Sequence, residues 1–318
     1  MGINKQCLTF GRSDIITNAE SVHIGYGTDD NFVMPMGVSI ISVLENNPDL
    51  DFVFHVLTEG ISEKSISQLR KITDTYPRCA FQIHTIDLSV IEGLPVYALG
   101  KATYIRVFLD QILPDSVEHI LYLDGDIVCV HSLKDLWTAD FGHHTVMVVE
   151  DVPKTAVKQG KKFNIEHYFN AGMIFMNMKS WKQKQISSQF LKVCFTYKEK
   201  LNYLDQDALN IVLQDKKLLL GRKYNYIPES AEIPEIPQDT VFLHYAGTKP
   251  WYCWLEFPLK KYFMKYYAMS PWKDESLAEP RNYREMHYMS RACWRRGDYS
   301  TSMKWFIKYV IERKRTKK

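Results

Sequence analysis

The sequence predicts an α/β protein whose core is a mostly parallel, twisted sheet with helices on both faces. Runs rich in β-branched and aromatic residues alternate with helical stretches of roughly 10–15 residues, a pattern typical of βαβ units. The composition, 46% hydrophobic and 24% charged over 318 residues, suits one large α/β domain with an appendage. Because no apolar stretch approaches the roughly 20 residues that span a bilayer, we expect a soluble or peripheral protein.

The predicted elements follow one another in a regular order from residue 21 onward. Pro35 suits the first turn of the first helix, and Tyr76 with Pro77 ends the second. The first turn of a later helix carries Asp205, a favourable place for a carboxylate. Strands are expected at 21–27, 51–58, 80–87, 119–124, 145–150 and 240–245, and helices at 35–46, 62–75, 103–113, 180–200, 205–214 and 299–315.

Polar clusters follow two of these strands at the point where each strand ends. T-D-D-N comes after the strand at 21–27, and Asp124-Gly125-Asp126 ends the strand at 119–124. Ligands of open α/β sheets bind at the carboxyl ends of the strands. We therefore expect both clusters to converge on one crevice.

Asp124 and Asp126 interrupt the apolar run H-I-L-Y-L-D-G-D-I-V-C-V. Two neighbouring carboxylates repel each other and are costly to bury unless a cation lies between them. A divalent metal with oxygen ligands removes that cost, so this pair is a candidate metal site; the alternative is a partly exposed strand end. A similar triplet at Asp49 and Asp51 lies in N-P-D-L-D and is typical of a turn.

His244, at the end of the last predicted strand, is the candidate third ligand. A histidine at a strand end can also be a structural, hydrogen-bonded residue. Here Gly247 and Lys249 follow it, and a flexible backbone plus a cation is what an anionic phosphate needs. Two carboxylates and one imidazole suit Mn²⁺ better than Ca²⁺, and Mg²⁺ is also compatible.

Five further polar residues are candidates for ligand contacts. Asp29 and Asn31 follow the first strand and could bond a ribose or a base edge, or simply form an Asx turn. Arg106 lies on an apolar helical stripe and calls for a buried anion or carboxylate partner. Asn170 and Gln206 could orient sugar hydroxyls or cap local backbone.

Seven short motifs, in this order, resemble those of a known enzyme family. They are I-G-Y-G-T-D-D-N-F, A-T-Y-I-R-V, L-Y-L-D-G-D-I, Y-F-N-A-G-M-I-F-M-N, L-D-Q-D-A-L-N, H-Y-A-G-T-K-P-W and S-P-W-K. Together they resemble the retaining family-8 glycosyltransferases, most closely the galactosyl- and glucosyltransferases that extend the lipopolysaccharide core of Gram-negative bacteria. The resemblance implies a GT-A, Rossmann-like nucleotide-sugar-binding fold, with a catalytic domain at 21–272 and a basic, helical extension at 273–318.

The resemblance also implies roles for individual residues. Mn²⁺, or Mg²⁺, would be held by Asp124, Asp126 and His244 against the diphosphate of a UDP-hexose. The catalytic residues facing the hexose would be Gln206, Asp205 and Asn170. This sequence has one residue fewer than the family between glycine and lysine in A-G-T-K-P-W, which would re-aim Lys249. The implied donor-binding residues are Gly27, Asp29, Asn31, Arg106, Asp124, Gly125, Asp126, Ala171, Gly247 and Lys249.

Sugar transfer with retention sets a chemical requirement on these residues. Breaking the bond from sugar C1 to the diphosphate builds negative charge that a metal and Lys249 would stabilise. Retention usually implies a carboxylate nucleophile, but the matching position is Gln206, a weak nucleophile. We therefore predict front-face attack by the acceptor hydroxyl, with the departing phosphate taking the proton. Asp205 and Asp207 remain alternative nucleophiles.

The C-terminal segment differs in charge from the rest of the chain. Residues 281–318 hold twelve Lys/Arg against three acidic residues. The predicted helix at 299–315 puts Tyr299, Met303, Phe306, Ile307 and Val310 on one face, which indicates a membrane-surface element or a helix packed on the catalytic domain. We expect docking on the anionic inner face of the bacterial inner membrane, where a lipid-linked core oligosaccharide would be the acceptor. Nucleic acid explains the charge less well, since no reading motif accompanies it.

Two other functions remain open on the sequence. L-Y-L-D-G-D-I-V also resembles the motif of haloacid-dehalogenase-type phosphatases, with Asp124 as the nucleophile and Asp126 as a general acid. That assignment leaves His244 and T-D-D-N unexplained. A non-catalytic nucleotide-sugar binding module would bind UDP without turning over a donor. The choice between UDP-galactose and UDP-glucose is also open.

Overall fold

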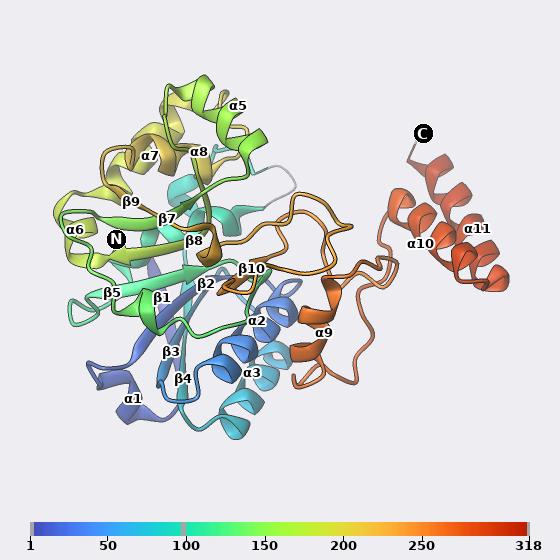
Figure 1. Ribbon diagram of the computed structural model, residues 1–318, viewed down its shortest axis with the longest axis horizontal. Helices are drawn as coiled ribbons and strands as arrows, with labels where there is room; N and C mark the ends of the chain where they lie inside the picture. The colour runs from blue at the N-terminus through green and yellow to red at the C-terminus, as the bar shows by residue number, and fades with distance from the viewer. Residues whose placement is uncertain (1–2, 97–99, 317–318) are drawn as a thin grey trace.

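A computed structural model describes residues 3–96 and 100–316, and its centre is an eight-stranded sheet (Figure 1). The strand order is β1-β4-β3-β2-β5-β8-β7-β9, and a two-stranded sheet pairs β10 with β6. The strands β4, β3, β2 and β5 run parallel, whereas β8 is antiparallel to both of its neighbours. The strands are β1 (Asn4–Gly11), β2 (Val22–Gly27), β3 (Phe52–Thr58), β4 (Cys79–Ile86), β5 (His119–Leu123), β6 (Ile127–Cys129), β7 (Val146–Glu150), β8 (Phe169–Asn177), β9 (Lys217–Leu220) and β10 (Phe242–His244).

Helices cover both faces of the large sheet, as Figure 1 shows for α2 and α3 on one face and α7 and α8 on the other. One core packs α2, α3 and α9 on the sheet, and a second packs η3, α6, α7 and α8 on its other face. The helices are α1 (Ser13–Thr17), α2 (Val33–Asn46), α3 (Glu63–Thr75), η1 (Ser89–Ile91), η3 (Lys101–Gln111), α4 (Lys134–Trp137), α5 (Pro153–Phe163), α6 (Met178–Gln183), α7 (Ile186–Tyr197), α8 (Asp205–Val212), η4 (Arg222–Tyr224), α9 (Lys260–Tyr267), α10 (Tyr283–Arg295) and α11 (Tyr299–Arg315).

The predicted fold class is confirmed, with two local differences. The helix expected at 103–113 is a 3₁₀ helix, η3. The single helix expected at 180–200 is wrong: α6 and α7 are separate, because Gln185 adopts a left-handed conformation with φ 51° that breaks the helical path.

The two ends of the chain lie in different parts of the structure. β1 pairs antiparallel with β4 at the edge of the large sheet, although it precedes residue 21, the expected start of the catalytic domain. At the other end, α10 and α11 pack against each other as a hairpin beside the main body (Figure 1). The boundaries 21–272 and 273–318 remain a prediction.

Candidate functional site

The pairing of the two short strands brings the candidate metal ligands together. Asp124-Gly125-Asp126 forms the turn between β5 and β6. Since β6 and β10 are antiparallel with Ile127 opposite His244, the histidine lies beside that turn, and the backbone N–H of Tyr245 donates to Asp126 O (2.9 Å). The carboxyl end of β5 thus carries the cluster that the sequence predicted there.

Asp124, Asp126 and His244 offer ligand atoms within 4.8 Å of one another. His244 Nε2 lies 3.2 Å from Asp126 Oδ1, and that oxygen is buried without a hydrogen-bond partner among the described residues. A Cβ at Gly172 would overlap the His244 ring and lie 3.0 Å from Asp124 Oδ2, so a glycine keeps this space open. Two carboxylates and one imidazole fit a divalent cation such as Mn²⁺ or Mg²⁺, and the buried Asp126 oxygen without a partner among the described residues is a position where such a cation would bind.

Lys249 also belongs to this cluster. Its ammonium group bonds Asp126 Oδ2 and donates to the backbone oxygen of Tyr245 (2.8 Å). Burial alone raises the pKa of Asp126, but the charge of Lys249, together with the neighbouring His244 ring, outweighs it and holds that pKa well below its ordinary value. Asp126 is therefore a carboxylate at neutral pH.

Arg106, on η3, is buried and has the carboxylate partners that were predicted for it. It is 5% exposed, with Nη2 3.0 Å from Asp124 Oδ1 and Nε 3.1 Å from Asp205 Oδ2. Its guanidinium also lies over the ring of Tyr122, 4.4 Å from the centroid. Burial raises the pKa of Asp205 to about 7, against the lowering effect of Arg106. The ion pair with Arg106 thus holds the side chain of Asp124 in place.

Asn170 and Gln206 lie next to each other and bond the backbone of β8. Gln206 Oε1 accepts from Asn170 Nδ2 (3.2 Å) and from the backbone N–H of Ala171 (3.0 Å). Gln206 Nε2 donates to Asp151 Oδ2 (2.9 Å), a buried carboxyl whose pKa is raised by burial. The backbone bonds expected as one alternative are therefore present, and Asp151 is a partner that the sequence did not indicate.

A cavity of about 390 Å³ lies beside the carboxylate cluster. At its rim Asp29 forms the Asx turn, because its Oδ1 accepts from the backbone N–H groups of Asn31 (2.9 Å) and Phe32 (3.2 Å). Asn31 Oδ1 in turn accepts from Arg281 (2.7 Å). The lining residues are Gly27, Thr28, Asp29, Asn31, Phe32, Gly100, Ala102, Thr103, Arg106, Tyr122, Asp124, Gly125, Asp126, Lys249 and Arg281.

Most of the predicted site residues line this cavity, and the others lie behind or beside it. Asn170, Ala171, Asp205 and Gln206 are buried. Gly247 and His244 line a neighbouring cavity of about 220 Å³.

Among the lining residues that the sequence did not single out, Phe32 and Arg281 have long side chains at the rim. The aromatic ring of Phe32 is 41% exposed and meets Trp251 edge-on at 5.7 Å. It stands next to Asn31 in T-D-D-N-F, so an exposed aromatic after a polar turn was the available signal. Arg281 reaches the cavity from the segment before α10, and no local pattern marks it.

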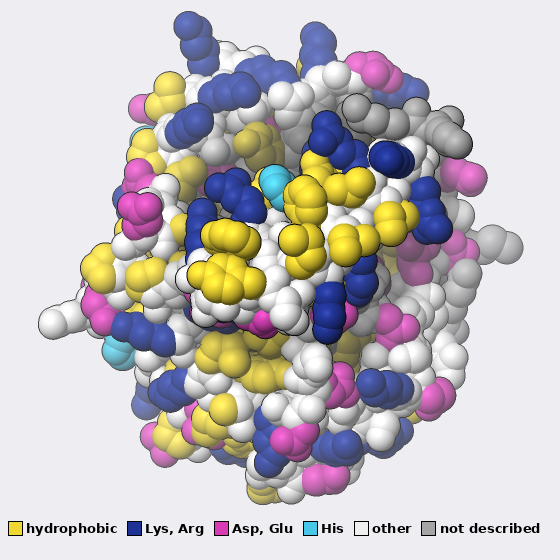
Figure 2. Space-filling model, turned by 90° about the vertical axis from the view of Figure 1, so that its right-hand side faces the viewer, with side chains coloured by type: hydrophobic (Ala, Val, Ile, Leu, Met, Phe, Trp, Pro, Cys, Tyr) yellow, Lys and Arg dark blue, Asp and Glu magenta, His cyan; other side chains and the backbone are white. Residues whose placement is uncertain are grey.

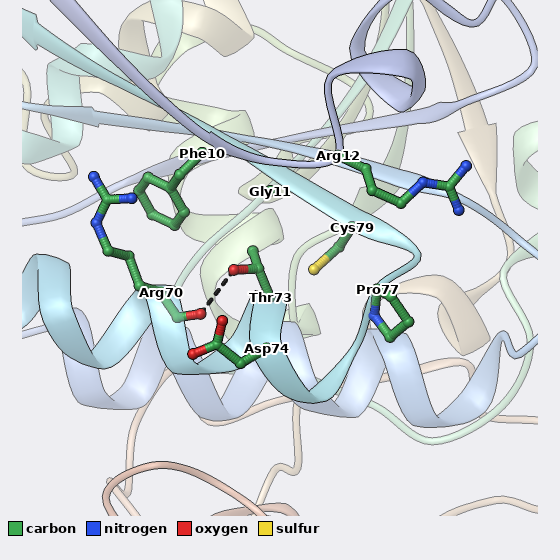
Figure 3. Close-up of a pocket in the computed structure, with 8 residues that line it drawn as sticks. All are labelled: Phe10, Gly11, Arg12, Arg70, Thr73, Asp74, Pro77 and Cys79. Atoms are coloured by element: carbon green, nitrogen blue, oxygen red, sulfur yellow. Dashed lines mark hydrogen bonds between the residues drawn. The ribbon is translucent and has the colours of Figure 1, made fainter.

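A second hollow, of about 410 Å³, lies away from these residues between the end of β1 and α3 (Figure 3). Figure 3 shows the guanidinium groups of Arg12 and Arg70 pointing outward from it. Arg12 pairs with Asp14, and Arg70 lies over the Phe10 ring at 4.5 Å. Because these two guanidinium groups have partners of their own, the carboxylate cluster remains the candidate functional site.

Comparison with known proteins identifies the family of this chain. The sequence model described as glycosyl transferase family 8 matches residues 23–254, and that of the family's C-terminal part matches residues 257–313. The lipopolysaccharide 1,3-galactosyltransferase of Salmonella typhimurium is 29% identical over 92% of this chain and 91% of its own length. A lipopolysaccharide 1,2-glucosyltransferase of Escherichia coli is 30% identical over 80% of both chains.

Among solved structures, a similar fold is that of the galactosyltransferase LgtC in complex with donor and acceptor sugar analogs. The TM-score is 0.70 at 24% identity, over 80% of this chain and 99% of that one. At this identity the likeness shows the fold, a GT-A arrangement of the sheet.

Proposed function

Because the chain belongs to glycosyl transferase family 8, we propose that it moves galactose or glucose from a UDP-sugar to a hydroxyl of a lipopolysaccharide core oligosaccharide. The observation that carries this proposal is the cluster of Asp124, Asp126 and His244 beside the cavity at the end of β5. The similarity to lipopolysaccharide galactosyl- and glucosyltransferases over 80–92% of the chain supports the acceptor class.

The rim of the cavity is proposed to hold the uridine end of the donor. An exposed aromatic ring such as Phe32 offers a face on which a base can stack. The Oδ1 of Asn31 accepts from Arg281, so its amide Nδ2 is the group that would donate to the donor's uridine. A base at this rim would place the diphosphate toward Asp124, Asp126 and Lys249, which line the same cavity.

Asp124, Asp126 and His244 would hold the divalent cation, with Mn²⁺ proposed and Mg²⁺ as the alternative. When bound, such a cation stabilises negative charge on the departing diphosphate. The chain itself contributes Arg106, whose bonds to Asp124 and Asp205 keep one carboxylate in place. Lys249, now on Asp126, supplies a positive charge beside the leaving group.

The structure favours the front-face route over a covalent one. Gln206 Oε1 is engaged by two donors, and Asp205 is buried and bonded to Arg106, so neither is free to attack. Asp207 is fully buried and accepts from Tyr168. In the proposed step the acceptor oxygen bonds C1, the C1–O bond to the diphosphate breaks, and the hydroxyl proton goes to the departing phosphate oxygen.

A donor screen tests this function. We expect UDP-galactose or UDP-glucose, with Mn²⁺ and a core oligosaccharide acceptor, to yield UDP and a product with the α configuration, and chelation of the metal to stop the reaction. Binding of UDP without turnover of any UDP-hexose would instead indicate the binding module. Family membership does not support the phosphatase alternative, and Mn²⁺-dependent hydrolysis of p-nitrophenyl phosphate would be needed to restore it.

The hairpin of α10 and α11 is proposed to dock on the anionic cytoplasmic face of the bacterial inner membrane, which would place the enzyme at its lipid-linked acceptor. Of the predicted apolar face, Tyr299, Met303, Phe306 and Ile307 are exposed, and Val310 is half-buried. Figure 2 shows apolar side chains gathered on this side of the molecule with Lys and Arg around them. Across residues 3–96 and 100–316, none of the helices combines the length and apolar character needed to cross a membrane. A surface that joins aromatics with basic groups favours docking on anionic lipid.

Flotation with anionic vesicles tests the docking. Phe306→Asp combined with Ile307→Asp should lower the bound fraction severalfold. The matched control is Val157→Asp, which changes an apolar residue that is 70% exposed on α5 and should leave binding unchanged. Equal binding of all three proteins would contradict the membrane role.

A further inference from the structure

Asn225, just after η4, is a buried amide that connects two parts of the site. It is 3% exposed. One end of its side chain lies 2.9 Å from His244 Nδ1, and the other lies 3.0 Å from Asn170 Oδ1. A single side chain thus touches both the candidate metal ligand and the amide pair at Asn170 and Gln206.

A backbone hydrogen bond determines the orientation of the side-chain amides of Asn170 and Asn225. The N–H of Gly172 donates to Asn170 over 3.0 Å, so the atom that it meets is the oxygen, Oδ1. The atom of Asn225 that faces the same oxygen must then be a donor, Nδ2. The other end of the amide, which faces His244, is therefore the carbonyl oxygen.

This orientation decides the tautomer of His244. A carbonyl oxygen only accepts, so His244 Nδ1 carries the hydrogen. With that hydrogen on Nδ1, the nitrogen left to act as a ligand is Nε2, which faces Asp126 at 3.2 Å. An imidazole held in this way presents its ligating nitrogen to the site without reorientation.

We propose that Asn225 is a positioning residue that fixes the ring and the tautomer of His244 for the cation and, through Asn170, orients Gln206. The inference rests on the proposed function in taking His244 as a ligand. The second part follows from Asn170 Nδ2, which donates to Gln206 Oε1 (3.2 Å) while Asn225 holds Asn170 Oδ1 from the other side. The two ends of Asn225 therefore serve different steps, metal binding and sugar transfer.

Two substitutions separate these roles. Asn225→Asp keeps the oxygen that accepts from His244 but replaces the donor to Asn170 with a second oxygen. Asn225→Leu keeps the volume and removes both groups. Mn²⁺ affinity, measured by electron paramagnetic resonance on protein free of UDP-sugar, should fall about 10- to 100-fold in Asn225→Leu, and in Asn225→Asp should stay no more than about threefold below wild type. Turnover by Asn225→Asp should show a lower kcat with little change in the donor KM, because Asn170 and Gln206 lose their anchor.

Asn47→Leu is the matched control, since Asn47 is also a buried amide (2% exposed) and bonds the backbone of Leu133 far along the chain from Asn225. It should lose stability without losing Mn²⁺ affinity. If Asn225→Leu does not fold, Asn225→Ser takes its place. The proposal is overturned if Asn225→Leu binds Mn²⁺ as wild type does, or if Asn225→Asp loses as much affinity as Asn225→Leu. Failure of the wild type itself to bind Mn²⁺ would contradict the proposed function instead.

Discussion

Buried histidines occupy two regions of this molecule, and their partners make them different. His244 meets the carboxylate of Asp126 through Nε2 at 3.2 Å. His23, His55 and His84, on β2, β3 and β4, bond one another instead, with Nδ1 to Nε2 distances of 2.9 Å and 3.3 Å. We call these three the histidine ladder.

The ladder is neutral at pH 7. Burial lowers the pKa of His23 and of His84 to about 4, and burial with repulsion from both neighbours holds that of His55 well below its ordinary value. The three histidines of the ladder, buried without a carboxylate beside them, are thus neutral structural groups. A neighbouring carboxylate at the end of a strand makes a histidine a candidate ligand.

The largest expected effect is at the carboxylate that distinguishes the two regions. Asp126→Asn keeps the shape of the side chain and removes its charge, so Mn²⁺-dependent turnover of UDP-hexose should fall about 10²-fold or more. The control is Asp115→Asn, which removes an exposed carboxylate paired with Lys182 at 2.6 Å. Wild-type turnover in Asp126→Asn would show that the carboxylate beside His244 does not distinguish it functionally from the ladder.

The next effect concerns the space around His244. Gly172→Ala adds a Cβ that overlaps the imidazole, and Mn²⁺ affinity should fall about 10- to 100-fold as the ring is displaced. Gly221→Ala is the matched change, because a Cβ there meets nothing within 4 Å. Equal Mn²⁺ affinity in the two variants, measured by calorimetry, would show that the ring does not need that space.

The histidine ladder should make the free energy of unfolding depend on pH. The pKa of His23 and of His84 is about 4 in the folded protein against an ordinary 6.5, so the unfolded chain binds more protons between these values. Stability is therefore full above pH 6.5 and falls as the pH drops toward 4, by about 3 kcal/mol for each of the two histidines. Asp205, with a pKa raised to about 7, opposes this with the opposite sign, since protonation below pH 7 relieves its burial.

Urea unfolding between pH 4.5 and 8 checks this dependence. His84→Leu removes one member of the ladder and should flatten the slope of the unfolding free energy against pH, whereas the exposed His143→Gln should not. An unchanged slope in His84→Leu would mean that the ladder is not the source.

The smallest expected effect is that of the ladder on the candidate metal site. His23→Gln should leave Mn²⁺ affinity within about twofold of wild type, because mutations at separate sites act independently. A tenfold loss, measured by the same calorimetric titration, would show that the two groups of histidines are coupled.

The parts of the structure that could be predicted from sequence are those with a local pattern. β3 and β5 are apolar runs, and the carboxylates of Asp124 and Asp126 stand out against such a run. β1 (N-K-Q-C-L-T-F-G) is a polar edge strand without that pattern, and the break at Gln185 occurs at a residue that does not usually adopt positive φ.

The residues that support the site were not predictable in the same way. Asn225 acts through contacts with His244 and Asn170, which lie 19 and 55 positions away in the chain. The need for a glycine at 172 appears only when the neighbouring side chains are in place. Sequence patterns therefore indicated the charged cluster, and the fold alone reveals what holds it in position.

Anomalous diffraction from crystals grown with Mn²⁺ and UDP tests directly whether Asp124, Asp126 and His244 bind the metal. We expect a manganese peak bounded by Asp124, Asp126 and His244, with the diphosphate against it and the uracil toward Phe32. A fully bound UDP whose diphosphate lies elsewhere, with no manganese at these three side chains, would contradict it.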